Sequence, residues 1–291
     1  MSSAARAGEK PRMVNSHGRF VWYVLMTTDM EAANAFYTNV VGWGARDASM
    51  PGLPYTVFSA GDTPVSAAMI LPRSPDSSDR GPGWIGYVTV KDVDAAVDQI
   101  KHLGGAVHVE PQNILNLSRF SVVADPQKAS LALFKWLKPD QEQAADAQRP
   151  VHLRSRGGIG WHELHAANWE QAWAFYSELF GWQKAGIDTL ATGPYQLFSA
   201  EGQTIGAMCT KAPTVPRPLW LYYFNVGDID AAVKRVKAGN GQILQGPVAV
   251  PDGNWVVQCM DPQGAVFALM GTSGVGYFER LPPHEQARRS R

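Results

Sequence analysis

The sequence carries no excess of charge of either sign. Its 26 Lys and Arg residues balance 26 Asp and Glu residues, so the formal net charge is zero at pH 7. Nucleic acids and anionic membranes bind proteins through basic patches, so we expect neither as a partner. The chain also lacks any run near the roughly 18 apolar residues of a membrane-spanning helix. What remains is an ordinary globular composition, whose 45% hydrophobic content can bury two cores.

Cysteine is scarce, with only Cys209 and Cys259 in 291 residues. A secreted disulfide scaffold needs more, so the sequence favours a reducing, cytoplasmic location. Both thiols lie in apolar, strand-like runs, which favours inert burial over catalysis. The N-terminal segment is charged and lacks the apolar core of a signal peptide, so a tail is predicted there.

What the sequence does contain is an internal repeat. A strand, a turn and an amphipathic helix are predicted between Trp161 and Trp182, and the same order of residue types lies between Trp22 and Trp43. The offset is 139 residues at both ends, 161 minus 22 and 182 minus 43. The chain is therefore predicted to be two copies of one domain, as its length also favours at about 150 residues per domain. The predicted parts are a tail at 1–18, a first domain at 19–137, a linker at 138–157, a second domain at 158–272 and a tail at 273–291.

Each domain is itself predicted to contain two similar units. In the first domain Asp29 is placed to cap a helix that ends at Gly42, and Asp92 to cap a second helix. Each helix follows a strand rich in aromatic and β-branched residues and precedes two or three further strands. Asn168 and Asp228 take the capping positions in the second domain, so the same units are expected there.

Several motifs recur in the same order in both repeats. They are Asp29, Phe36-Tyr37 and Gly42-Trp43 in the first, Asn168, Phe175-Tyr176 and Gly181-Trp182 in the second, the helix starts at Asp92 and Asp228, and the Asp-Pro-Gln turns at Asp125 and Asp261. This pattern resembles the vicinal oxygen chelate superfamily of glyoxalase I, extradiol dioxygenases and bleomycin or fosfomycin resistance proteins, and is most similar to its tandem two-domain "hydroxylase" or glyoxalase-like members. The resemblance implies an α+β fold of two tandem glyoxalase-like domains. In each, paired βαβββ units form a curled sheet around a cleft.

The resemblance also implies where a metal would bind. In this superfamily His, Glu or Gln side chains on three strands hold a divalent ion, a donor set that suits several transition metals. By motif, the corresponding positions hold side chains that cannot bind a metal: Trp22, Trp84 and Ala132 in the first repeat, and Trp161, Trp220 and Ala268 in the second. A further ligand strand passes near Met69 and Met208, with no His, Asp or Glu within two residues of either. We therefore predict no metal and no other cofactor.

The four tryptophans at these positions have two interpretations. They can fill the vacated sites as core, because an indole buries about 150–250 Å². Alternatively Trp22, Trp84, Trp161 and Trp220 line a cleft and stack on a flat or aromatic ligand. Gln258, which replaces a valine of the first repeat, adds a polar group to the second cleft and is included with the ligand-binding candidates.

Glu163 and His165 are the candidate catalytic residues. Alternate side chains of a strand share a face, so both are expected beside Trp161, about 7 Å apart along the strand. They could bracket a substrate as acid and base, with the pKa of Glu163 raised by burial; otherwise they pair with backbone or solvent. The first repeat has Val24 and Met26 instead, so the functional cleft is predicted in the second repeat. His162 points the other way and is interpreted as solvated or structural.

Four functions stay open at this stage. The favoured one is a metal-independent small-molecule-binding protein, for an aromatic or polyketide-like ligand. The others are a metal-free hydroxylase, cyclase, lyase or isomerase using Glu163 and His165, a metal-dependent glyoxalase or dioxygenase, and a regulatory protein that uses the fold as an interaction surface. Because tandem domains of this superfamily mimic the dimer of single-domain relatives, a monomer or a weak homodimer is expected.

Overall fold

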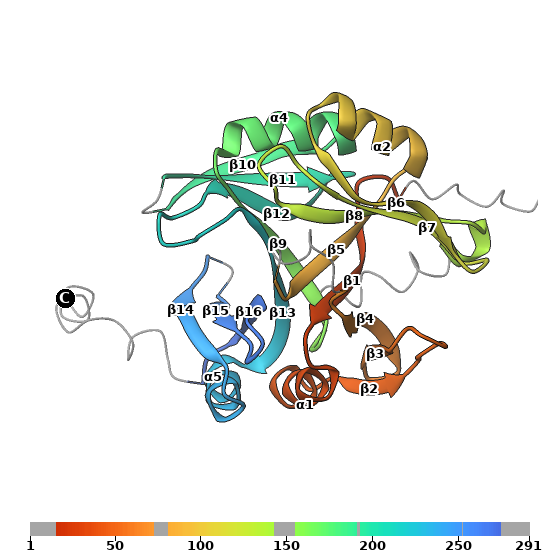
Figure 1. The fold of residues 1–291 in the computed structure, drawn as a ribbon. Coiled ribbons are helices and arrows are strands. Elements are labelled where there is room, and N and C mark those ends of the chain that lie inside the picture. The colour runs from red at the N-terminus through yellow and green to blue at the C-terminus, as the bar shows by residue number, and fades with distance from the viewer. Residues whose placement is uncertain (1–15, 73–80, 143–154, 191–192, 252, 275–291) are drawn as a thin grey trace, which may run out of the picture.

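A computed structural model describes residues 16–72, 81–142, 155–190, 193–251 and 253–274. Each half of the chain folds into one eight-stranded mixed sheet with two helices packed against it (Figure 1). This confirms the predicted α+β fold of two tandem domains of the same topology. Most of both predicted tails and of the linker lies outside the described residues, and the domain boundaries stay a prediction. Within the described ranges, no helix combines the length and apolarity needed to cross a membrane.

The first domain has strand order β2-β3-β4-β1-β5-β8-β7-β6. Its two units meet where β1 pairs with β5 in antiparallel orientation, and within each unit the first strand runs parallel to the last. The strand β2 is a short edge strand whose four residues are all exposed. The elements are β1 (Phe20–Thr27), α1 (Met30–Val41), β2 (Gly44–Asp47), β3 (Tyr55–Ala60), β4 (Thr63–Ile70), β5 (Gly83–Thr89), α2 (Val93–His102), β6 (Ala106–Ile114), β7 (Ser118–Ala124) and β8 (Ser130–Trp136).

The second domain repeats this topology with strand order β10-β11-β12-β9-β13-β16-β15-β14. Here β9 and β13 are the central antiparallel pair. The elements are β9 (Ile159–Ala166), α4 (Trp169–Phe180), β10 (Gln183–Leu190), β11 (Gly193–Ala200), β12 (Gln203–Thr210), β13 (Leu219–Asp228), α5 (Ile229–Ala238), β14 (Gln242–Ala249), β15 (Trp255–Met260) and β16 (Val266–Thr272).

The helices begin and end where local side-chain chemistry predicts. The Asp29 carboxylate accepts a hydrogen bond from the third residue of α1, and Asn168 does the same for α4. Gly42 and Gly181 end these helices with φ of 87° and 67°, a left-handed conformation that favours glycine. The capping predictions are therefore confirmed.

The two domains pack around a pseudo-twofold axis, with α1 beside α5 and α2 beside α4 (Figure 1). One hydrophobic cluster contains buried residues of both domains. Trp43 and Phe224, from different domains, have ring centroids 5.0 Å apart, and those of Tyr37 and Phe267 are 5.4 Å apart. The prediction of a separate core for each domain is wrong at this interface, although each sheet belongs to one domain.

Reciprocal hydrogen bonds join the domains. The indole of Trp43 donates to the Gly157 carbonyl at 2.7 Å, and that of Trp182 donates to the Gly18 carbonyl at 2.6 Å. Both glycines have positive φ, and a Cβ at Gly18 would lie 2.8 Å from the Phe180 carbonyl oxygen. The tryptophan of the Gly-Trp motif that ends each helix therefore also forms a hydrogen bond to the other half of the molecule.

Candidate functional site: a buried carboxylate on the second sheet

The second sheet carries the predicted residues Trp161, Glu163 and His165 on the face away from its helices. A small hydrophobic cluster on this face joins the indole of Trp161 to Tyr223 and Ala268. Glu163 is 5% exposed, and the side chain of His165 is 12% exposed. The prediction from strand alternation, that these three residues share one face of β9, is therefore confirmed.

Glu163 is the centre of a directional hydrogen-bond network. One of its oxygens, Oε2, accepts from the Tyr195 hydroxyl at 2.7 Å and from the Tyr223 hydroxyl at 2.8 Å. The Trp161 indole in turn donates to Tyr195 at 3.0 Å, and the Gln258 amide donates to Tyr223. An indole N–H can only donate, so the hydroxyl of Tyr195 turns its own proton towards Glu163. Both series of hydrogen bonds, from Trp161 through Tyr195 and from Gln258 through Tyr223, therefore end at the ionised carboxylate of Glu163.

This network corrects the predicted ionisation of Glu163. Burial raises the pKa of Glu163, but the close contact and charge of His165 and the hydroxyl donors Tyr195 and Tyr223 lower it by more, to below its ordinary value. The expectation of a raised pKa considered only the apolar surroundings. Two hydroxyl donors and a neighbouring imidazole together outweigh the cost of desolvating this carboxylate.

His165 contacts Glu163 directly, with Nε2 2.6 Å from Oε1. The predicted 7 Å is the spacing of the two residues along the strand; their side chains lean towards one another, so they do not bracket a substrate. The contact is close enough for an ion pair, yet it does not have the alignment of a hydrogen bond. Glu163 is thus placed to hold and orient the imidazole.

Cys209 completes this group and was missed in the sequence. It pairs with His165 across the parallel strands β12 and β9, and its Sγ lies within 4.8 Å of ligand atoms of Glu163 and His165. Burial raises the pKa of the Cys209 thiol to about 12, with a further contribution from the charge of Glu163. The sequence analysis took Met208 as the counterpart of Met69. In the structure Met69 pairs with Met26, and Cys209 pairs with His165, the counterpart of Met26. Cys209 is therefore the counterpart of Met69. One residue is inserted before this strand, and the 140-residue offset from Tyr55 to Tyr195 is the signal for it.

Trp84 and Trp220 fill the core, as the first of the two interpretations has it, and do not line this face as ligand-binding residues. The Trp84 indole donates to the Tyr37 hydroxyl at 2.9 Å and that of Trp220 to the Tyr176 hydroxyl at 3.1 Å, both inside the shared core. Their neighbours Ile85 and Leu221 face the other way, paired with Val24 and Glu163. A shift of one residue moves a strand side chain to the opposite face. Isoleucine and leucine cannot bind a metal either.

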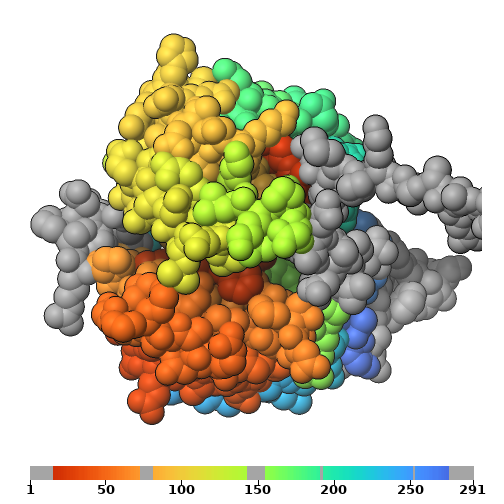
Figure 2. All heavy atoms as spheres, turned by 90° about the vertical axis from the view of Figure 1, so that its right-hand side faces the viewer, coloured from red at the N-terminus to blue at the C-terminus, as the bar shows by residue number. Residues whose placement is uncertain are grey.

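The first sheet has the same aromatic frame without the ionisable groups. The Trp22 indole donates to the Tyr55 hydroxyl at 3.3 Å, and Tyr87 takes the place of Tyr223. Val24 and Met26 stand where the second sheet has Glu163 and His165, within an apolar cluster. Figure 2 shows this side of the molecule as a furrow between β2–β4 (orange) and β6–β8 (yellow to yellow-green).

His162 is structural. Its Nδ1 donates to the Ile205 carbonyl at 2.6 Å, its Nε2 lies 2.6 Å from the Tyr23 hydroxyl of the other domain, and its ring stacks on Phe20 with centroids 4.0 Å apart. Tyr23 and His162 occupy equivalent positions of the two repeats, so this contact lies on the pseudo-twofold axis. The structural interpretation is correct, and the solvated one is wrong because His162 is 2% exposed.

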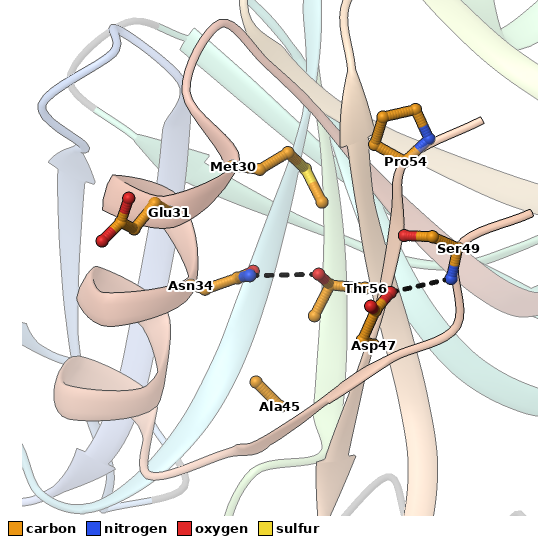
Figure 3. Close-up of a pocket in the computed structure, with 8 residues that line it drawn as sticks. All are labelled: Met30, Glu31, Asn34, Ala45, Asp47, Ser49, Pro54 and Thr56. Atoms are coloured by element: carbon orange, nitrogen blue, oxygen red, sulfur yellow. Dashed lines mark hydrogen bonds between the residues drawn. The ribbon is translucent and has the colours of Figure 1, made fainter. Parts of the chain in front are cut away.

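A separate surface pocket of about 390 Å³ lies between α1 and the β2–β3 strands (Figure 3). Its polar groups bind each other: the Asn34 amide donates to Thr56 at 3.0 Å, and the backbone N–H of Ser49 donates to Asp47 at 2.9 Å. Asp47 is fully exposed, and hydrogen bonds from Ser49 lower its pKa. The buried polar groups of the pocket are Thr56 and Oδ1 of Asn34, and its charged residues Glu31 and Asp47 are exposed, so this pocket has no buried charged group like Glu163.

Comparisons with known proteins agree with this architecture. The model of the Glyoxalase/Bleomycin resistance protein/Dioxygenase superfamily matches residues 19–133 and 158–269, and the chain therefore belongs to that superfamily. It is 31% identical to "Putative glyoxylase CFP32" of Mycobacterium tuberculosis over 86% of this chain and 93% of that protein. It is also 31% identical to "Anthracycline biosynthesis protein DnrV" of Streptomyces peucetius, over 87% of this chain and 93% of that protein.

Solved structures show the same fold at low identity. The 2,3-dioxygenase LapB of Pseudomonas sp. KL28 matches with a TM-score of 0.59 and 13% identity, over 92% of this chain and 97% of that one. The Mn(II)-bound glyoxalase of Novosphingobium aromaticivorans matches with a TM-score of 0.55 and 16% identity, over 88% and 82%. At such identities the likeness concerns the fold alone.

Proposed function

We propose that the second sheet binds a small aromatic or polyketide-like molecule without needing a metal. The observation that carries this proposal is the network centred on Glu163, which has no counterpart on the first sheet. An apolar face with a few convergent polar groups is the usual form of a small-molecule site. Trp161 and Tyr195 supply partly exposed ring surface, and Glu163 and His165 supply polarity. The relative named for anthracycline biosynthesis supports an aromatic ligand class.

The side chains at the superfamily's metal positions support metal independence. Trp161, Leu221 and Ala268 stand on the three strands that the resemblance identifies, and none offers a donor atom suited to a metal. The polar groups of this face instead arise from Glu163 and its partners. The two buried free thiols fit a reducing, cytoplasmic setting.

The alternative is a metal-free enzyme, such as a hydroxylase, cyclase or lyase, and the contact of Glu163 with His165 favours it specifically. In this version His165 moves a proton of the substrate, and the ionised Glu163 orients the ring and stabilises its charged form. Turnover of a bound ligand, followed by mass spectrometry, distinguishes the two functions.

The proposal is tested by tryptophan-fluorescence titration with an anthraquinone or anthracycline in the presence of EDTA. Glu163→Gln and His165→Ala are expected to weaken binding about tenfold or more, the loss of one charged hydrogen bond. Val24→Ala and Met26→Ala change the matched positions of the first sheet and should keep the affinity while lowering stability. Loss of binding in the first-sheet variants with retention in the second-sheet variants would contradict the proposal, as would binding that EDTA abolishes.

A further inference from the structure

Three different donor atoms converge beside the aromatic network of the second sheet. A carboxylate oxygen of Glu163, a ring nitrogen of His165 and Sγ of Cys209 come from the neighbouring strands β9 and β12. The ligand atoms of this group all lie within 4.8 Å of one another. The equivalent residues of the first sheet are Val24, Met26 and Met69, so the convergence exists on one sheet only.

The arrangement leaves these atoms available. Both tyrosine hydroxyls donate to Oε2 of Glu163, so they hold the carboxylate in place without occupying Oε1. Nε2 of His165 is buried and has no hydrogen-bond partner within the described part of the chain, despite its proximity to Oε1. Carboxylates that bind metals are commonly oriented by such outer hydrogen bonds.

We propose that Glu163, His165 and Cys209 form a binding site for a thiophilic divalent cation, with Zn²⁺ as the best fit. One oxygen, one nitrogen and one sulfur donor suit Zn²⁺, which takes three protein ligands and leaves a fourth position open. This site differs from the metal position of the superfamily, because its residues lie two and four places beyond Trp161 and on β12. It goes beyond the proposed ligand binding, which needs no metal.

Loading this site requires two local changes. Zinc bonds of about 2.0–2.1 Å to oxygen and nitrogen in tetrahedral geometry place those atoms about 3.3 Å apart, so Oε1 and Nε2 must separate from 2.6 Å. The Cys209 thiol must also lose its proton to bind as a thiolate. Uptake therefore releases a proton, and the affinity should rise with pH.

The experiment is a Co²⁺ titration of the full-length, reduced and chelator-treated protein, with Co²⁺ as an optical substitute for Zn²⁺. One equivalent should produce a near-ultraviolet thiolate-to-cobalt absorption, which Zn²⁺ then removes by displacement. Cys209→Ser should abolish this absorption, and His165→Gln should weaken binding about tenfold or more while keeping the band. Cys259→Ala removes the other buried thiol, which lies in the shared core, and should change neither result.

Absence of the band at one equivalent, or its persistence in Cys209→Ser, would overturn the metal site. Weak uptake that none of the three substitutions changes would identify an adventitious ion only. Circular dichroism of each variant verifies that it is folded; should Cys209→Ser unfold, His165→Gln still decides, since an unchanged affinity contradicts the site. The anthraquinone titration uses EDTA and no cobalt, so failure of the proposed function leaves the cobalt result unaffected.

Discussion

At the scale of single residues, the two sheets differ chiefly where Glu163 replaces Val24. The surrounding tyrosines are present in both domains, but only in the second do they have a carboxylate to bind. Tyr223 donates to Glu163 at 2.8 Å, whereas Tyr87 in the matching position faces an apolar cluster. The same side chain therefore has an electrostatic role in one domain and a packing role in the other.

Substituting these two tyrosines should separate the roles. Tyr223→Phe removes one of two hydroxyl donors to a buried carboxylate and is expected to lower the free energy of unfolding by about 1–3 kcal/mol. Tyr87→Phe removes a hydroxyl that meets no carboxylate and should cost less than about 1 kcal/mol. Urea denaturation of both variants measures the difference. Equal costs would show that the Glu163 network adds no stability.

The ionisation of Glu163 predicts a specific response to acid. Its pKa in the folded protein lies below the ordinary 4.5, chiefly because His165, Tyr195 and Tyr223 outweigh desolvation. As pH falls below about 4.5, the unfolded chain binds a proton at Glu163 before the folded one does, so acid favours unfolding. The stability of wild type relative to Glu163→Gln should therefore fall as pH drops through this window and stay level above it. A relative stability that rises on acidification would contradict the assignment.

At the scale of elements, β9 serves two purposes through its two faces. Trp161, Glu163 and His165 face the candidate site, while His162 faces the partner domain and contacts Tyr23. Because successive strand residues point to opposite faces, nearby histidines of one strand can have unrelated environments. The strand β9 thus contributes to both the candidate site and the domain interface, but through different side chains.

Substituting the two histidines of β9 tests this division. His162→Ala removes the stack on Phe20 and leaves the Ile205 carbonyl without its donor, so the free energy of unfolding should drop by about 2–4 kcal/mol. His165→Ala, on the other face and partly exposed, should change stability much less but weaken ligand binding. Thermal melts and the anthraquinone titration measure both quantities. A ligand-affinity loss confined to His162→Ala would show that the faces were misassigned.

At the scale of the whole molecule, the domains are joined by matched buried contacts. The Tyr37 hydroxyl donates to Asp261 at 2.9 Å, and the Tyr176 hydroxyl donates to Asp125 at 3.0 Å. Burial raises the pKa of both carboxyls, and their hydrogen bonds offset only part of that rise. These contacts cross the pseudo-twofold axis, so neither domain satisfies its own polar groups alone.

We therefore expect the chain to be a monomer, because its two domains already cover each other's apolar surface in one shared core. Sedimentation equilibrium at micromolar concentration should give a mass close to the 31.7 kDa of one chain. A dilution series of the same full-length protein serves as the control and should show no change in mass. A dimer that persists on dilution would contradict this expectation. Separated domains should aggregate, since each would expose half of the shared core.

Much of the architecture follows from local sequence alone. The caps at Asp29 and Asn168 and the alternation along β9 each depend on residues close together in the chain, and the 139-residue repeat follows from comparing two stretches of that chain. Such patterns are set by backbone geometry, which the nearest neighbours decide. They were sufficient to predict the tandem domains and the common face of Trp161, Glu163 and His165.

The tertiary structure alone decided which side chains meet. The sequence left open whether Trp84 and Trp220 fill the core or line a cleft, because the face of a strand side chain depends on partners far along the chain. It missed Cys209, because one inserted residue changes the offset between the repeats, so that Cys209 and not Met208 is the counterpart of Met69. It also assigned the wrong direction to the pKa of Glu163, because the donors Tyr195 and Tyr223 are 32 and 60 residues away. Electrostatics depends on distances in space, and these arise only when separate strands pair.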